Sequence, residues 1–322
     1  MKNAIHPIGQ MREGQEVTGF YVVRKKQLKT KRDGAFYLHL ELGDASGRIT
    51  ANIWDDASSL DERIKTGSIV KVRGRVNSYH NTLQLSIAKV RPASEQDAVD
   101  ASRFLPKTEC DLNSLKRSMQ EMLDSVENRW LRKLLDSFFR DADWLKRFQE
   151  APGGKLWHHA CLGGLFEHTM TVVKACHMLL KNYEALDRDL TITAAFLHDI
   201  GKMKEYRYDQ GFIEYSDEGR LIGHISIGAQ QVRDQIRSID GFPEALEMKL
   251  VHLLLSHQGE LEHGSPVVPL VPEGMVLYYA DEMDSKVNAL QHIQKRDREP
   301  GRHWSQWVPV LERFIYLGEH DH

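Results

Sequence analysis

The spacing of apolar residues changes once along the chain, near residue 94, from a period of two to helical spacing. Before that point, apolar side chains stand at alternate positions in short runs, as at Phe36, Leu38, Leu40 and Leu42. Alternation of this kind is typical of a strand with one buried face, whereas spacings of three and four residues are typical of a helix with one buried face. The change therefore predicts a multidomain α+β chain, with an all-β part followed by an all-α part.

The first part, about residues 14–92, predicts a small closed barrel. Turn signals such as Asp33-Gly34 separate the alternating runs, and five short strands with one apolar face fit a barrel of this size. Two strings, Tyr37–Ile49 and Gly67–Val76, resemble an OB-fold. The resemblance implies an OB-fold domain over residues 1–93 that binds single-stranded nucleic acid.

Basic and aromatic side chains of this domain are compatible with strand binding, because cations pair with phosphates and rings stack on bases. The candidate residues are Lys25, Lys26 and Lys29 at the first hairpin, Arg73 and Arg75 on an outward face, and the rings of Tyr37 and Trp54. A charged hairpin is also often just solvated, and Trp54 is equally compatible with a packed position. Both interpretations stay open at this point.

Helical spacing then continues through residues 94–150, which we predict to be a helical connector. Leu115, Met119 and Met122 follow one another at helical intervals, and Leu131, Leu134 and Leu135 do so further on. These residues are expected to pack the two ends of the molecule together, and nothing in this segment indicates chemistry.

The clearest candidate for chemistry is the string of residues 194–202, AAFLHDIGK. His198 and Asp199 are adjacent at the predicted last turn of a helix, and Gly201 is expected to end that helix in a left-handed cap. An imidazole and a carboxylate on consecutive residues offer one divalent ion two ligands of intermediate hardness.

Further polar residues stand in separate predicted helices of the same half: His168, His224, His257 and Asp281. His168 follows Leu165 by three residues and precedes Val172 by four, so it points to the buried side of its helix. A lone buried histidine is most often bonded to a carbonyl group. Several buried polar residues at separate helix ends are more easily explained by one shared ion site.

The pattern His168…His198-Asp199…Asp281 resembles the signature of the HD-domain metal-dependent phosphohydrolases, and His224 and His257 match the members that hold two ions. The longer context resembles the YhaM-type 3′→5′ exoribonucleases through the strings WHHACLGGLFEHT (157–169), LHDIGK (197–202), LIGH (221–224), SHQGE (256–260), GSP (264–266) and YADEMDSK (279–286). The resemblance implies an all-α HD domain over residues 151–322. It also implies a metal-dependent enzyme that hydrolyses single-stranded RNA from its 3′ end to nucleoside monophosphates.

The six ligand positions suggest roles for individual residues. Two divalent ions about 3.5–4 Å apart can activate a water and stabilise a leaving oxygen, and Asp199 is the candidate bridge between them. Mixed His/carboxylate sites suit Mn²⁺, Fe²⁺, Co²⁺ or Zn²⁺ better than Mg²⁺, and the family resemblance implies Mn²⁺. Lys202 is expected to hold a phosphate oxygen, with a plain C-terminal helix cation as the alternative. His159 is a candidate supporting or substrate-binding group.

Two other functions stay open on the sequence alone. The same site could hydrolyse a small nucleotide or cyclic dinucleotide, or an OB-fold binding module could carry a structural or inactive HD domain. The retention of all six ligand positions disfavours the binding module, and the basic, aromatic barrel disfavours the small substrate. Single-stranded DNA is a second candidate substrate beside RNA. Glu260, His263 and Ser265, on the loop after His257, are further candidates for shaping a substrate groove.

Composition bounds the remaining possibilities. The net charge is −3, so a nucleic-acid surface has to be local. The three cysteines, Cys110, Cys161 and Cys176, are far apart and argue against a disulfide framework or a thiolate zinc site. Neither a signal pattern nor an apolar run of about 18 residues is present, which favours a cytoplasmic protein without a membrane partner. An apolar helix face serves equally as core or as an interface between copies, so a homo-oligomer stays open.

Overall fold

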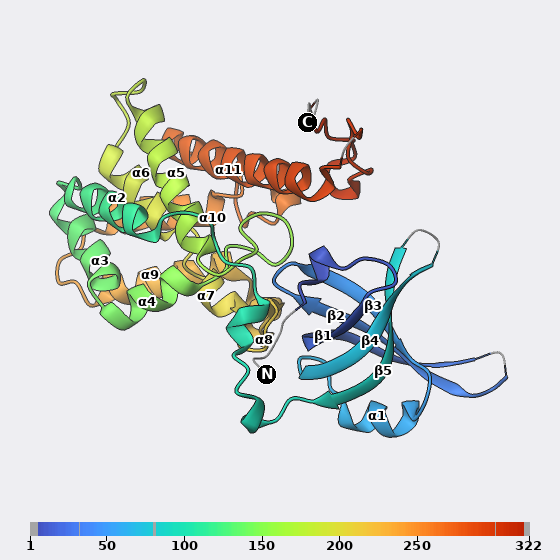
Figure 1. Cartoon of the computed structure of the whole chain (residues 1–322). Helices are drawn as coiled ribbons and strands as arrows, with labels where there is room; N and C mark the ends of the chain where they lie inside the picture. The colour runs from blue at the N-terminus through green and yellow to red at the C-terminus, as the bar shows by residue number, and fades with distance from the viewer. Residues whose placement is uncertain (1–5, 32, 80–81, 300, 319–322) are drawn as a thin grey trace. The chain divides into compact units, whose positions relative to one another are not determined.

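The computed structural model describes residues 6–31, 33–79, 82–299 and 301–318 (Figure 1). The chain forms two compact units. One holds the residues up to Lys107 together with Arg207–Glu214, and the other holds Thr108–Tyr206 together with the residues from Tyr215 onward. No helix within these described ranges combines the length and the apolarity that a membrane span requires.

The first unit is a closed five-stranded barrel, as the sequence predicts. Its strands are β1 (Glu16–Thr30), β2 (Phe36–Asp44), β3 (Gly47–Ile53), β4 (Ile69–Tyr79) and β5 (Thr82–Pro92), with the short helix α1 (Ala57–Arg63) between β3 and β4. The strand order is β1-β2-β3-β5-β4, and only the β3–β5 pair is parallel among the described pairings. The alternating residues Leu38, Leu40 and Leu42 are fully buried in the barrel core, which confirms the period-two prediction for them, whereas Phe36 at the start of the same run is 50% exposed.

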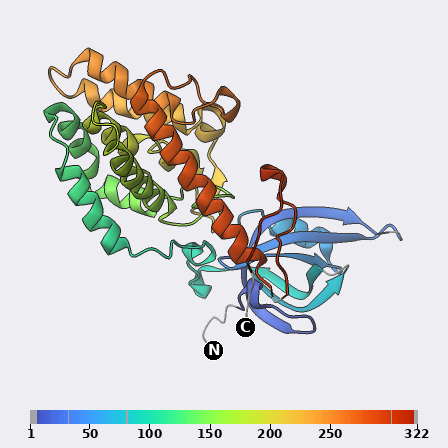
Figure 2. The same cartoon turned by 90° about the horizontal axis from the view of Figure 1, so that it is seen from above.

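The second unit is helical. Its helices are α2 (Leu112–Asp124), α3 (Arg129–Phe139), α4 (Ala142–Glu150), α5 (Gly164–Leu180), α6 (Arg188–Leu197), α7 (Lys202–Glu205), α8 (Asp217–Ile222), α9 (His224–Arg237), α10 (Glu244–Ser256) and α11 (Pro272–Asp297). Two short strands, β6 (Tyr206–Arg207) and β7 (Glu214–Tyr215), pair with each other. Helix α5 packs against both α6 and α11, and Figure 2 shows α11 as a long orange-red helix beside the others.

Helices α2–α4 share the hydrophobic core of the second unit. Leu131, Leu135 and Phe139 are buried in one cluster with Phe166 of α5 and Phe196 of α6. Each of the three helices begins at an Asp or Asn whose side chain accepts hydrogen bonds from the first free backbone amides, at Asp111, Asn128 and Asp141. The structure thus groups residues 112–150 with the helical unit. The division into residues 1–93, 94–150 and 151–322 stays a prediction.

Candidate metal centre

The six residues predicted as ligands converge inside the helical unit. His168 comes from the middle of α5, His198 and Asp199 follow α6, His224 begins α9, His257 follows α10, and Asp281 lies on α11. Two groups bring their ligand atoms within 4.8 Å of one another: His168, His198 and Asp281, and Asp199, His224 and His257. Helix ends and the faces of two helices, α5 and α11, therefore supply every member of the set.

Asp199 stands between two pairs of imidazoles. Its Oδ2 lies 3.3 Å from His168 Nε2 and 3.4 Å from His198 Nε2. Its Oδ1 lies 3.5 Å from His224 Nε2 and 3.8 Å from His257 Nε2. The two oxygens of one buried carboxylate thus face different histidines, which is the arrangement of a ligand that two ions share.

Each of the four histidines is oriented by a hydrogen bond from its Nδ1. The acceptors are the carbonyl oxygens of Ala195 for His198 (2.8 Å) and of Leu254 for His257 (2.7 Å), Glu205 Oε1 for His224 (2.9 Å), and Asp284 Oδ2 for His168 (2.6 Å). Carbonyl and carboxylate oxygens only accept, so Nδ1 carries the proton in every ring. Each Nε2 is consequently left facing Asp199 or Asp281. Burial lowers the pKa of His168, but its hydrogen bonds to Asp199, Asp281 and Asp284 outweigh burial and leave this pKa well above the ordinary value, so a metal ion would displace a proton from this ring.

The donor set fits a divalent ion. Within the described residues, both carboxylate oxygens of Asp199 and the Nε2 of His224 are buried without a hydrogen-bond partner. Buried polar atoms are normally paired, so Asp199 Oδ1 and His224 Nε2 lack a partner that a metal ion would supply, whereas Asp199 Oδ2 has the Lys202 ammonium as an ion-pair partner. Four imidazole nitrogens with two carboxylates form a mixed set of the kind that suits Mn²⁺, Fe²⁺, Co²⁺ or Zn²⁺.

The charges of the centre are set by burial and by opposite charges. Burial alone would raise the pKa of Asp199, but Lys202 and His198 hold this pKa well below its usual range. Burial, together with the nearby His198, lowers the pKa of His257 to about 4. Asp199 is therefore ionised and His257 neutral at neutral pH, which are the forms that bind a metal ion.

Lys202 lies inside the centre. Its Nζ is 2.6 Å from Asp199 Oδ2, as an ion pair outside hydrogen-bonding geometry, and the side chain is almost fully buried. Burial lowers the pKa of Lys202, but attraction to Asp199 and Asp281 outweighs it and leaves the pKa raised. Lys202 is the first residue of α7, which has only four residues, so it also lies in the last turn of that helix and the alternative interpretation as a helix cation stays open.

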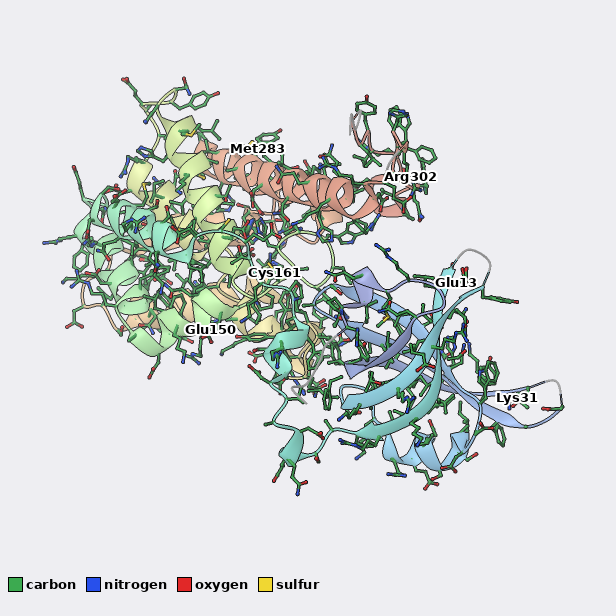
Figure 3. All side chains as sticks on the ribbon, in the orientation of Figure 1. Glu13, Lys31, Glu150, Cys161, Met283 and Arg302 are labelled. Carbon is green, nitrogen blue, oxygen red and sulfur yellow. The ribbon has the colours of Figure 1, made fainter. Side chains whose placement is uncertain are left out.

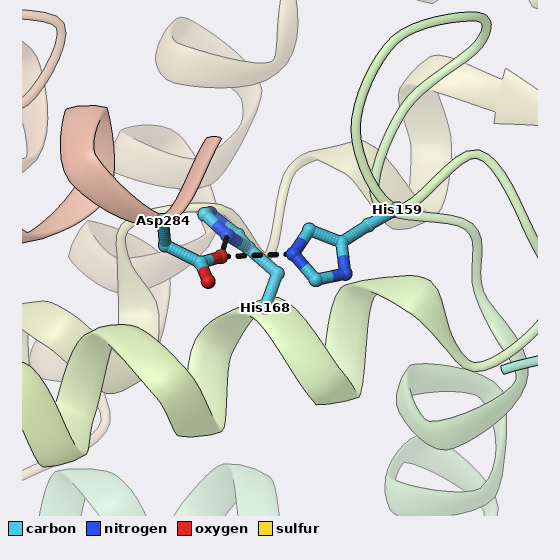
Figure 4. Close-up of side chains that lie close together, drawn as sticks. All are labelled: His159, His168 and Asp284. Atoms are coloured by element: carbon cyan, nitrogen blue, oxygen red, sulfur yellow. Dashed lines mark hydrogen bonds and ion pairs between the residues drawn. The ribbon is translucent and has the colours of Figure 1, made fainter. Parts of the chain in front are cut away.

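His159 lies behind His168, away from the ligand atoms. Its Nε2 donates to Asp284 Oδ2 at 2.8 Å, and the same oxygen accepts the bond from His168 Nδ1 (Figure 4). The side chain is 2% exposed. His159 therefore fixes Asp284, which in turn fixes His168, and a direct part in the reaction stays a prediction.

Our sequence analysis did not identify Asp284 and Glu205, the two carboxylates that orient His168 and His224. A signal existed for Asp284, because it follows Asp281 by three residues and so shares its helix face. Glu205 follows Lys202 by the same interval within α7. Neither spacing reveals which histidine each carboxylate contacts.

Gly201 differs from its predicted role. It is not a left-handed cap, because its φ is −62° and it directly precedes α7. A Cβ at this position would come within 2.0 Å of the His224 carbonyl oxygen and 2.8 Å of the Gly228 amide nitrogen. Glycine is needed here because α7 and the start of α9 approach each other at this point, and this approach brings His224 to Asp199.

A cavity of about 470 Å³ opens onto the centre. The candidate ligands His224 and Asp281 and the side chain of Lys202 line this cavity. The other lining residues are Gly153, Gly154, Lys155, Leu156, Trp157, His158, Tyr206, Tyr215, Gln258, Glu282 and Ser285. Sequence reasoning did not single out His158, which stands beside Lys202 with its pKa lowered to about 3, first by burial and then by that lysine. The predicted groove residues Glu260, His263 and Ser265 are not among these described lining residues, and Ser265 Oγ lies 2.8 Å from the Val267 carbonyl oxygen within its own loop.

The candidate strand-binding residues lie on the barrel. Tyr37 and Trp54 stack with their ring centroids 4.9 Å apart, and Trp54 is 44% exposed, so it is not fully packed. Lys31 lies in the turn between β1 and β2 (Figure 3), and its Nζ is 5.5 Å from the centroid of the Trp54 ring. Lys25, Arg73 and Arg75 are exposed, and Lys29 is half-buried. Lys26 is held by Asp61, with Nζ 2.9 Å from Oδ1.

Two family models match the chain. The model described as HD domain matches residues 165–286, which contain all six candidate ligands. The model described as OB-fold nucleic acid binding domain matches residues 21–93, which contain most of the barrel. These matches confirm the predicted order of a barrel domain followed by an HD domain.

Curated relatives match over nearly the whole chain. The chain is 31% identical over 309 residues to the 3′-5′ exoribonuclease YhaM of Oceanobacillus iheyensis, with 94% of each chain covered. It is 29% identical over 303 residues to the protein of the same name from Bacillus subtilis, with 94% of this chain and 95% of that one covered. Both domains and the region between them are therefore shared with these relatives.

Proposed function

The chain belongs to the YhaM family of 3′-5′ exoribonucleases, and we propose that it shortens single-stranded RNA from the 3′ end at the centre around Asp199. It is accordingly a metal-dependent hydrolase. The observation that carries the assignment of the site is the position of Asp199, whose two oxygens face separate pairs of imidazoles.

The residues would divide between two ions. One ion would be held by His168, His198 and Asp281, and the other ion by His224 and His257. Asp199 would contribute to both ions. Bound divalent ions supply Lewis acidity toward the phosphate and a nucleophilic water at neutral pH. We propose Mn²⁺ as the activating ion on the strength of the family resemblance, since the mixed imidazole and carboxylate set suits Fe²⁺, Co²⁺ and Zn²⁺ equally well.

Lys202 contributes a fixed positive charge at the cavity wall. With its pKa raised, the ammonium keeps its proton at neutral pH and is available to a non-bridging oxygen of the scissile phosphate. The carboxylate of Asp284 fixes the orientation of His168, and that of Glu205 fixes the orientation of His224. Neither imidazole therefore has to reorient when substrate enters.

The barrel would capture the RNA strand. The stacked rings of Tyr37 and Trp54 offer a flat surface for bases, and the exposed Lys25, Arg73 and Arg75 offer charge to phosphates. Stacking and phosphate contacts read little sequence, so the expected substrate class is broad. RNA is the first expected substrate and single-stranded DNA the second.

A labelled oligonucleotide tests this function. Metal-stripped protein is mixed with a 5′-labelled single-stranded RNA, or DNA of the same sequence, and given Mn²⁺ or Mg²⁺. Products that shorten from the 3′ end with Mn²⁺, and that disappear in Asp199→Ala, are the expected result. An RNA that shifts on a native gel but stays intact with either ion would contradict it and would redirect the search to small phosphorylated molecules.

A further inference from the structure

The segment after α11 folds into a small two-stranded element, which we name the C-terminal hairpin (residues 303–317). Residue bridges join Trp304 to Tyr316 and Val308 to Arg313. The backbone amide of Leu317 donates to the His303 carbonyl at 2.8 Å. The hairpin lies just beyond Arg302, while Met283 marks the part of α11 near the metal centre (Figure 3).

The inner face of the C-terminal hairpin is fixed to α11. Val308 and Ile315 are buried in one cluster with Ile293 of the helix. Polar contacts add to this packing, because Gln306 N donates to Asp297 Oδ2 at 3.1 Å and Gln294 Nε2 donates to the Tyr316 carbonyl at 2.9 Å. The hairpin is therefore held by the C-terminal part of α11.

The outer face carries four large aromatic side chains that remain about half exposed: Trp304 (55%), Trp307 (51%), Phe314 (53%) and Tyr316 (48%). They form two edge-to-face pairs. The centroids of Trp304 and Tyr316 are 5.3 Å apart, and those of Trp307 and Phe314 are 5.2 Å apart. Since the inner face already supplies the contacts to α11, these rings are surplus to the packing of the hairpin and present flat apolar surface to solvent.

Two arginines stand beside these rings, since Arg302 Nε donates to the Trp304 carbonyl oxygen at 3.2 Å and Arg313 directly precedes Phe314. Residues 295–322 contain five Lys or Arg residues (Lys295, Arg296, Arg298, Arg302 and Arg313) and five Asp or Glu residues (Asp297, Glu299, Glu312, Glu319 and Asp321), so the cationic character is confined to the two arginines beside the rings. Aromatic rings beside arginines are the chemistry that binds single-stranded nucleic acid, because bases stack on the rings and guanidinium groups pair with phosphates.

We propose that the C-terminal hairpin is a second binding site for the single-stranded RNA substrate, upstream of the 3′ end held at the metal centre. This inference rests on the proposed function. Asp284 and Asp297 are 13 residues apart on the continuous helix α11, which corresponds to roughly 20 Å. A stacked strand rises 3.4 Å per nucleotide, so the helix spans roughly six nucleotides. Helix α11 thus sets a fixed distance between the reaction and the stacking surface.

Substrate length separates this site from the metal centre. In the full-length protein with Mn²⁺, the double variant Trp304→Ala/Trp307→Ala is expected to lose about tenfold in kcat/KM on a 15-nucleotide RNA, the equivalent of about one lost base stack. On a 4-nucleotide RNA the loss is expected to stay below about twofold, because the strand cannot reach from the centre to the hairpin. Trp304→Phe/Trp307→Phe keeps the rings and is expected to restore most of the loss.

Tyr183→Ala is the matched control, since Tyr183 is a 57% exposed aromatic residue between α5 and α6 of the same unit. It is expected to leave both substrates unaffected. Unchanged kcat/KM of the double alanine variant on the long RNA would overturn the proposal, and so would an equal loss on both lengths. A lower molar mass of the variant by light scattering, with unchanged RNA affinity, would instead make the hairpin an interface between copies.

Binding without turnover keeps this test independent of the proposed activity. In EDTA, the affinity of a fluorescein-labelled 15-nucleotide RNA is measured by anisotropy, and the double alanine variant is again expected to bind about tenfold more weakly. If the wild type degrades no RNA with Mn²⁺, the proposed function fails, whereas the affinity difference still decides whether the hairpin binds the strand.

Discussion

His168 Nδ1 lies 2.6 Å from Asp284 Oδ2, with both side chains buried in the helical unit. The bond joins α5 to α11 (Figure 4). It leaves His168 Nε2 facing Asp199, at 3.3 Å, and Asp281, at 3.1 Å. Asp284 itself is outside the ligand set, but the orientation of one ligand depends on it. Such supporting contacts contribute strongly to metal affinity, because a ligand that is free to rotate must be ordered when the ion binds.

Asp284→Asn is therefore expected to weaken Mn²⁺ binding about 10- to 100-fold while the protein stays folded. The amide keeps the size of the side chain but loses the charge that holds His168 in one tautomer. Calorimetric titration of Mn²⁺ into metal-stripped protein measures the effect. Lys286→Gln, an exposed position on the same helix, is the control. Equal affinities of Asp284→Asn and wild type would show that His168 is oriented without this carboxylate.

Lys202→Gln tests the ammonium at the cavity wall. Removing one fixed charge that stabilises a developing phosphate charge is expected to lower kcat about 100-fold. Bound Mn²⁺ is expected to stay the same or to increase, because Lys202 pairs with Asp199, where the metal would bind. Single-turnover rates at saturating RNA and metal content by atomic absorption provide the two readouts. If Lys202→Gln has the wild-type single-turnover rate, Lys202 does not contact the phosphate and only pairs with Asp199 in the metal-free protein.

Sequence alone predicted the barrel and singled out six residues that the structure brings together, because both depend on local signals. Alternation at Leu38, Leu40 and Leu42 fixes which face of a strand is buried, wherever the strand lies in the sheet. His198 and Asp199 are neighbours in the chain, and each further ligand stands at the end or on the inner face of a helix that its own spacing predicts.

The supporting contacts were out of reach because they depend on packing between distant segments. His168 and Asp284 are 116 residues apart, and nothing in the local pattern of either pairs them. The role of Gly201 was wrong for the same reason, since the steric constraint comes from the His224 backbone on another helix. The outer face of the C-terminal hairpin was missed because Trp304 and Trp307 are three residues apart while Phe314 and Tyr316 are two apart, so the short segment indicates no single period.

The lysines at the first hairpin are expected to differ in their contribution to RNA binding. Lys25 is well exposed, and its ion pair with Glu41 at 3.5 Å is solvated, so it is free to exchange this partner for a phosphate. Lys26 is held more closely and is less exposed, since its Nζ contacts both the carboxylate and the carbonyl oxygen of Asp61. Lys25→Ala and Lys29→Ala are therefore expected to weaken binding more than Lys26→Ala.

The salt dependence of the affinity measures these contributions. Each phosphate contact that is lost is expected to reduce the slope of log affinity against log salt by about 0.7 for a single strand. Anisotropy titrations of labelled RNA between low and high salt give the slope, and Lys65→Ala, at an exposed lysine of the same unit, is the control. If Lys25→Ala and Lys29→Ala keep the wild-type affinity and slope, the hairpin charge is only solvated.

Asp97 is expected to make the stability of the barrel unit depend on pH. Its carboxylate accepts two hydrogen bonds from Arg91, at 2.7 and 2.8 Å, and one from the Ser94 amide, and these bonds hold its pKa well below the ordinary value. A carboxyl whose pKa is lower in the folded state adds stability above its unfolded pKa of about 3.9, and this stability is lost as the pH falls through the folded pKa. The destabilisation by Asp97→Asn is thus expected to be full at pH 7 and to shrink below about pH 4. Urea unfolding at pH 7 and at pH 3 measures the destabilisation. Glu13→Gln, at an exposed carboxylate of the same unit, is the control. An equal destabilisation by Asp97→Asn at pH 7 and pH 3 would assign the effect of Asp97 to packing and not to its charge.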